Sequence, residues 1–179
     1  SLLPHLVEET CEVVDAVEGG TDDDLREELG DLLLQVYFHA RIAENEGRFT
    51  IDDVARGIAD KLIRRHPHVF GDGEVPEDLR GVWERRKRQE KGRTSSLDGI
   101  ARSMSSLART QKVIARARTH EVPVELPGEP VTAEDVGERI QALVARAQAS
   151  GVDADAAVRE ALRGLEERIR QAEGPAGTA

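Results

Sequence analysis

The chain has 179 residues, of which 34% are charged and only 3% are aromatic, and its formal net charge is −10. No apolar run approaches the roughly 20 residues that a membrane-spanning helix needs, and a single cysteine excludes a disulfide-stapled scaffold. The acidic balance argues against general nucleic-acid binding, because phosphate contacts need clustered cations. With no visible signal peptide, the composition predicts a cytoplasmic protein whose aliphatic core suits helices packed on helices.

Helical spacing of apolar residues and helix-boundary residues predict an all-α protein. The Gly19-Gly20 pair ends the first helix, Thr21 with Asp24 begins the second, and His66-Pro67 ends the third. The expected helices cover residues 4–18, 22–46, 50–65, 76–91, 97–118, 132–149 and 154–172. A loop is expected over residues 66–74, a polar linker over 92–96 and a proline-rich break over 119–131.

Charge is distributed unevenly along these elements. Residues 1–60 hold sixteen acids and four bases, whereas residues 61–93 hold ten bases and six acids. A solvated surface with chance clustering would give this pattern. A site for a metal ion and a phosphate-bearing ligand would need both an acidic segment for the metal and a basic segment for the phosphate.

Two pairs of acids lie on the first two helices, Glu9 with Glu12 and Glu28 with Asp31. Residues three apart share one helix face, with about 5–6 Å between their Cβ atoms. The two-residue glycine link lets the helices run antiparallel. The two acidic pairs are therefore expected to lie at similar heights and to face one another at the edge of the buried stripe.

Four carboxylates at such a seam repel one another, by about 3 kcal/mol for one pair near 5 Å at an effective dielectric of 20. Protonation or a bound cation must relieve that repulsion. An all-oxygen site suits Mg²⁺, with Mn²⁺ as a substitute. Zinc is disfavoured because no cysteine or histidine stands at ligand spacing, and a ferritin-like di-iron site because no Glu-x-x-His is present. The alternative is a solvated acidic face.

The same acids belong to a longer pattern. Glu8–Glu12 and Glu28–Asp31 resemble the EExxE and ExxD signature of MazG-type nucleoside triphosphate pyrophosphohydrolases, members of the all-α NTP pyrophosphatase superfamily. The resemblance continues through LLLQV at 32–36, HAR at 39–41, DKLIRRHPHVF at 60–70 and SLDG at 96–99. The matching motifs are therefore closely spaced from residue 1 to about residue 100.

The resemblance implies a MazG-like helical bundle that uses Mg²⁺ to hydrolyse nucleoside triphosphates to the monophosphate and pyrophosphate, clearing non-canonical or surplus nucleotides. The implied metal ligands are Glu9, Glu12, Glu28 and Asp31, and Glu8 would lie behind them or help to orient water. The alternatives are a narrower dUTP, dCTP or phosphoribosyl-ATP pyrophosphohydrolase and a non-catalytic helical interaction module.

Two pairs of residues could bind the nucleotide. Lys61 and Arg65 are four apart on the third expected helix, and Trp83 and Lys87 have the same spacing on the fourth. A lysine and an arginine on one face can hold phosphates, and a tryptophan can stack on a base. The resemblance assigns all four to nucleotide binding. The alternative is an ordinary amphipathic helix with a core tryptophan and a solvated basic run.

The expected domains are a catalytic four-helix unit over residues 1–95, a helix and connector over 96–131, and a degenerate second MazG-like segment over 132–179 with a frayed C-terminus. Asp135–Glu138 falls where the first copy has its ExxD acids, but no EExxE precedes it. The second copy should therefore serve packing or dimer assembly, and a homodimer is expected because two helices alone make a thin core. Members of the MazG family usually carry a Cys-Pro-Trp-Asp segment just upstream of the position of Ser1. The candidate site residues above do not include any contact that such a segment would make.

Overall fold

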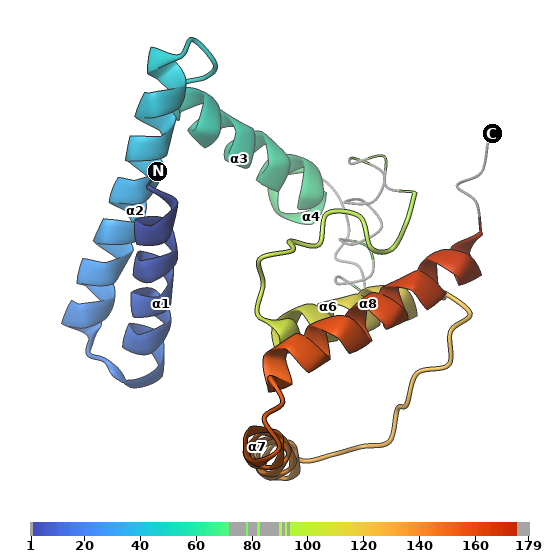
Figure 1. The fold of residues 1–179 in the computed structure, drawn as a ribbon. Coiled ribbons are helices and arrows are strands. Elements are labelled where there is room, and N and C mark those ends of the chain that lie inside the picture. The colour runs from blue at the N-terminus through green and yellow to red at the C-terminus, as the bar shows by residue number, and fades with distance from the viewer. Residues whose placement is uncertain are drawn as a thin grey trace. The chain divides into compact units, whose positions relative to one another are not determined.

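The structure is a computed structural model that describes residues 2–71, 78, 82, 90, 92 and 94–174. The described residues form helices and connections without a strand, which confirms the all-α prediction for them (Figure 1). The chain divides into two compact units, Ser1–Glu77 and Asp78–Ala179, and each is described by itself. None of the described helices is both long and apolar enough to span a membrane.

The first unit is built on a hairpin of two antiparallel helices, α1 (Leu3–Gly19) and α2 (Asp22–Asn45), which pack side by side (Figure 1). The chain reverses at Gly20, whose N–H donates to the Ala16 carbonyl at 3.0 Å. A Cβ atom on Gly20 would lie 2.9 Å from the Ala16 Cα, so this close approach requires a glycine. The predicted side-by-side arrangement of the first two helices is therefore found.

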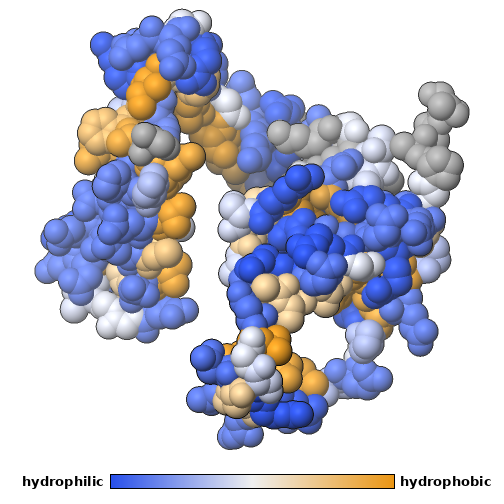
Figure 2. Space-filling view, in the orientation of Figure 1, coloured by the Kyte–Doolittle hydropathy of each residue, from blue (hydrophilic) through white to orange (hydrophobic). Residues whose placement is uncertain are grey.

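Helix α1 covers only one side of α2. Ala40 and Ala43 of α2 are buried, but Leu29, Leu33 and Val36 of the same helix are 49%, 55% and 38% exposed. Figure 2 shows further apolar side chains along the hairpin and the helix that follows it. The first unit therefore keeps a large part of its apolar surface uncovered.

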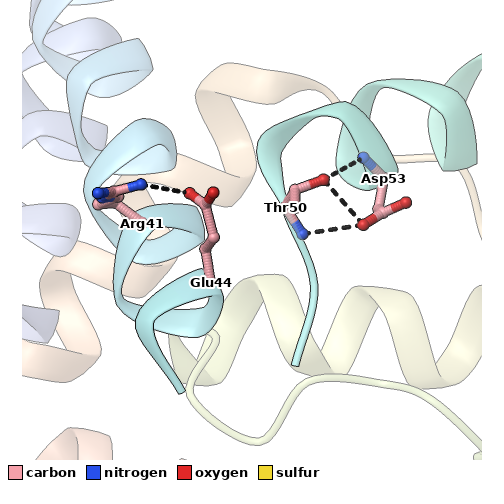
Figure 3. Close-up of polar contacts among 4 residues, drawn as sticks. All are labelled: Arg41, Glu44, Thr50 and Asp53. Atoms are coloured by element: carbon pink, nitrogen blue, oxygen red, sulfur yellow. Dashed lines mark hydrogen bonds and ion pairs between the residues drawn. The ribbon is translucent and has the colours of Figure 1, made fainter. Parts of the chain in front are cut away.

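Reciprocal capping boxes begin the second and third helices. The Thr21 hydroxyl oxygen accepts from the Asp24 N–H at 3.2 Å, and the Asp24 carboxylate accepts from the Thr21 N–H at 2.8 Å. Thr50 and Asp53 make the same contacts at the start of α3 (Ile51–Arg65), at 3.3 and 2.9 Å (Figure 3). These hydrogen bonds hold the pKa of both aspartates below the usual range. They explain why sequence alone located these helix starts.

Figure 3 also shows the end of α2, where the Arg41 guanidinium lies 2.8 Å from the Glu44 carboxylate. Helix α3 then packs against α2 and is followed by a single turn, α4 (Pro67–Phe70). The predicted loop over residues 66–74 is wrong at this turn. Pro67 stands at the first helical position, and the Phe70 N–H donates to the His66 carbonyl at 3.1 Å. The predicted helix over residues 76–91 lies outside the described residues, apart from Asp78, Val82 and Glu90.

The second unit packs α6 (Ser106–Thr119) against α8 (Ala154–Glu173), with α7 (Ala133–Ala149) against α8 (Figure 1). The predicted helices over 132–149 and 154–172 are confirmed to within one residue at each end. The core of this unit is aliphatic and consists of Ile100, Val113, Ala117, Leu162, Leu165 and Ile169.

The predicted helix over residues 97–118 begins only at Ser106, nine residues later. Gly99 accounts for the difference, because its positive φ of 71° lies outside the right-handed helical region. Just before it, one Asp98 carboxylate oxygen accepts from the N–H groups of Thr94 and Ser95 at 2.9 and 3.0 Å, which closes a local turn there.

Candidate functional site

Three acids from the two helices of the hairpin form one group. Glu9 of α1 and Glu28 and Asp31 of α2 each offer a carboxylate oxygen, and these oxygens lie within 4.8 Å of one another. All three side chains are half-buried at the helix seam. Such a group can hold a metal ion, because a hard cation takes carboxylate oxygens and cancels their repulsion. The structure thus brings together three of the four acids predicted as ligands.

The fourth acid, Glu12, is exposed and does not join that group in the described part of the chain. Its pKa is raised above the usual range by desolvation, then by the charge of Glu28 and by a hydrogen bond with Glu9. Glu12 and Glu28 also line one hollow of about 340 Å³ at the turn end of the hairpin. Glu12 therefore lies beside the acidic group and is electrostatically coupled to it.

The pKa of Glu28 is also raised. Desolvation is the largest cause, followed by the negative charges of Asp31, Glu27 and Glu9. Within the described residues, no arginine or lysine makes an ion pair with Glu9, Glu28 or Asp31. The site therefore concentrates negative charge that the described protein does not neutralise by itself.

Glu8 lies apart from this group. Its carboxylate is 3.5 Å from the His5 ring nitrogen on the preceding turn, and both side chains are largely exposed. A surface pair of this kind contributes little to stability. The structure thus gives Glu8 no contact with the three acids that could hold an ion.

Gln35 is a polar neighbour of the acids that sequence reasoning did not single out. It is only 6% exposed, and its amide nitrogen donates to the Glu9 carboxylate at 3.4 Å. Its amide oxygen is buried without a hydrogen-bond partner among the described residues. The signal in the sequence is its spacing, since Gln35 follows Asp31 by four residues and so shares its helix face.

The predicted nucleotide-binding residues lie elsewhere. Lys61 is half-buried and Arg65 is 3% exposed, both in the second half of α3. Helix α3 starts from the end of α2 that is far from the hairpin turn, so it does not place these cations within the acidic group (Figure 1). Trp83 and Lys87 lie outside the described residues.

The two acids of the second unit that the sequence analysis aligned with Glu28 and Asp31 lie in a different environment. Asp135 is the third residue of α7, and its carboxylate lies 3.1 Å from the Arg139 guanidinium one turn later on the same helix. Glu138 is exposed. No group of three metal-ligating side chains occurs in the described part of this unit.

Comparison with known proteins identifies the family. A MazG nucleotide pyrophosphohydrolase domain matches residues 1–70. A 26.1 kDa protein of Streptomyces cacaoi is 46% identical over 97% of this chain and 72% of its own length. The nucleoside triphosphate pyrophosphohydrolase of Escherichia coli K12 is 35% identical over 97% of this chain and 76% of its own length. The chain belongs to the MazG family.

A Mycobacterium tuberculosis protein of the same name is 43% identical over 97% of this chain, which spans only half of that relative's length. The MazG domain match ends at α4, so it contains the whole acidic group but none of the described second unit. The family relationship and the carboxylate geometry therefore concern the same hairpin.

The raised pKa values predict how pH and Mg²⁺ affect stability. Glu12 and Glu28 have a folded-state pKa above 4.5, the ordinary value for a glutamate. The folded protein therefore binds protons at these groups more tightly than the unfolded chain does. The metal-free protein should therefore lose stability as pH rises from about 4.5 through those raised values. Added Mg²⁺ should raise the unfolding temperature strongly at pH 7 and weakly at pH 4.5, because protons compete with the ion.

Thermal unfolding followed by circular dichroism, with and without Mg²⁺, checks this prediction. Glu12→Gln should reduce the loss of stability with pH, whereas Glu18→Gln on the same helix should leave it unchanged. Equal stabilisation by Mg²⁺ at the two pH values would contradict a carboxylate site.

Proposed function

We propose that this chain hydrolyses a nucleoside triphosphate to the nucleoside monophosphate and pyrophosphate, with Mg²⁺ bound at the acidic group of the hairpin. The observation that carries the proposal is the half-buried set of Glu9, Glu28 and Asp31, whose oxygens lie within 4.8 Å of one another. The names of the E. coli and M. tuberculosis relatives support the reaction.

The carboxylates of Glu9, Glu12, Glu28 and Asp31 would hold the ion. A bound Mg²⁺ supplies positive charge to the phosphate oxygens and makes a coordinated water more acidic. Three ligands converge from the seam, and Glu12 would complete the set by a change of its exposed side chain. Glu8, exposed on the first turns of α1, would help to orient the water.

Lys61 and Arg65 would contact the triphosphate, with Trp83 and Lys87 as the further nucleotide contacts. The support in the structure is the position of the first two, half-buried and buried on one face of α3. Residues four apart share one helix face, where a lysine and an arginine can hold phosphates together.

We also propose that the protein acts as a homodimer through the first unit, while the second unit is a degenerate, non-catalytic copy. The support is the exposed apolar surface of the hairpin and α3, where Leu33, Tyr37 and Ile63 are 55%, 52% and 50% exposed (Figure 2). Monomeric proteins rarely leave so many large apolar side chains in water. The second unit's Asp135 is already paired with Arg139.

Removing one metal ligand should abolish turnover. We expect Asp31→Asn and Glu28→Gln to lower kcat by at least about a hundredfold, because each change removes a carboxylate that would hold the ion. Helicity should be retained, because each change also removes a negative charge from a crowded group. The measurement is pyrophosphate release from a panel of canonical and modified nucleoside triphosphates. Glu18→Gln is the matched control on the same hairpin. No Mg²⁺-dependent release from any substrate of the panel by the unaltered protein would refute the proposed reaction.

Removing the α3 lysine should weaken substrate binding. We expect Lys61→Ala to raise KM for the triphosphate about tenfold with a smaller effect on kcat, because one phosphate contact is lost in both the bound substrate and the transition state. Lys112→Ala on α6 is the control. An unchanged KM in the Lys61 variant would count against its contact with phosphate.

Charging the exposed hairpin face should break the dimer. We expect Leu33→Lys to convert the dimer to a monomer, because a buried lysine without a partner opposes association. Light scattering coupled to size-exclusion chromatography gives the mass directly. Val131→Lys, at a residue 60% exposed outside the first unit, should leave the mass unchanged. A monomeric unaltered protein would exclude the homodimer.

A further inference from the structure

Gln35 places a buried, uncharged amide beside the acidic group. It lies on α2 one turn after Asp31 and is more than nine-tenths buried. Its amide nitrogen donates to a Glu9 carboxylate oxygen, and the contact joins α2 to α1 across the seam. Gln35 is thus placed to act on one of the three acids that could hold an ion.

The hydrogen bond is suited to orienting Glu9 rather than to stabilising the hairpin. At 3.4 Å it is longer than an ordinary N–H···O bond, which makes it weak. A carboxylate has two oxygens, so Glu9 can accept from the amide and still offer an oxygen to a cation.

The amide oxygen of Gln35 indicates that the acidic group can take up a ligand. The Gln35 Oε1 atom is buried without a hydrogen-bond partner among the described residues. A buried, unpaired carbonyl oxygen destabilises the protein that carries it. An oxygen of this kind, on an amide that contacts Glu9, can be satisfied by a donor or cation that enters the acidic group with the ligand.

We propose that Gln35 is a positioning residue of the metal site, which holds Glu9 toward the ion through its N–H and keeps its buried oxygen for a donor that arrives with the ion. The inference rests on the metal site proposed above, and it assigns to Gln35 no contact with the nucleotide. Gln35 should therefore control ion affinity more than fold stability.

Gln35→Met tests this inference, because methionine has a similar length but no N–H donor and only a weak thioether acceptor. We expect the affinity for Mn²⁺, measured by calorimetry on the full chain without nucleotide, to fall about tenfold, as for other residues that orient a metal ligand. The unfolding temperature of the metal-free protein should stay equal or rise, because an unpaired buried oxygen is removed. Leu32→Met, at a half-buried residue of α2, is the matched control and should change neither quantity.

Two further measurements separate the possible causes. Saturating Mg²⁺ should restore turnover in the Gln35→Met protein, since the defect is in ion affinity. If Gln35→Met does not fold, Gln35→Asn keeps an amide that is too short to reach Glu9 and should show the same tenfold loss.

Unchanged Mn²⁺ affinity in the folded variants would overturn the inference, and so would a loss of affinity that merely follows a lowered unfolding temperature. If the unaltered protein binds no Mn²⁺, the metal site itself is wrong and the inference falls with it. If it binds Mn²⁺ and Gln35→Met weakens that binding, but no triphosphate is hydrolysed, the proposed reaction fails while the role of Gln35 stands.

Discussion

The repulsion among carboxylates at the α1–α2 seam is the constraint on which the site depends. One carboxylate oxygen from each of Glu9, Glu28 and Asp31 lies within 4.8 Å of the other two, and all three residues are half-buried. Water screens the charges of these carboxylates less there than on an open helix face. The pKa of Glu28 is raised first by desolvation and then by this crowding of negative charges. The repulsion among these carboxylates lowers the free energy of unfolding of the hairpin in the metal-free state. A bound divalent cation would replace this repulsion by attraction between the cation and each carboxylate.

The hairpin can bear this cost because its geometry is set by features away from the acids. The close approach of Gly20 to Ala16 fixes the reversal, and the Thr21–Asp24 capping box fixes the first residue of α2. Once both are fixed, the register between α1 and α2 follows, and the acids meet whether or not they repel. The same two-helix geometry leaves the outer side of α2 uncovered, which links the acidic seam to an exposed apolar face.

Sequence alone predicted what depends on local rules. Capping residues and glycines located α1, α2, α3, α7 and α8, and a three-residue spacing on antiparallel helices predicted that Glu9, Glu28 and Asp31 would meet. Features that depend on individual hydrogen bonds were missed. The Asp98 carboxylate closes a local turn with the N–H groups of Thr94 and Ser95, and the positive φ of Gly99 interrupts the helix expected from residue 97. Gln35 was not recognised as a neighbour of the acids, because its importance comes from one contact across the seam and not from its residue type.

The two units differ in whether their acidic side chains are paired with a cationic side chain of the protein. In the second unit, Glu166 is buried but lies 2.6 Å from the Arg109 guanidinium, and Asp135 is paired with Arg139 on its own helix. A buried acid with a cationic partner has its charge compensated by the protein and gains nothing from an added ion. In the first unit, Glu9 accepts a hydrogen bond from the neutral amide of Gln35, which, as proposed above, orients the carboxylate without cancelling its charge. That difference, more than the number of acids, separates a site that can recruit a cation from an ordinary ion pair.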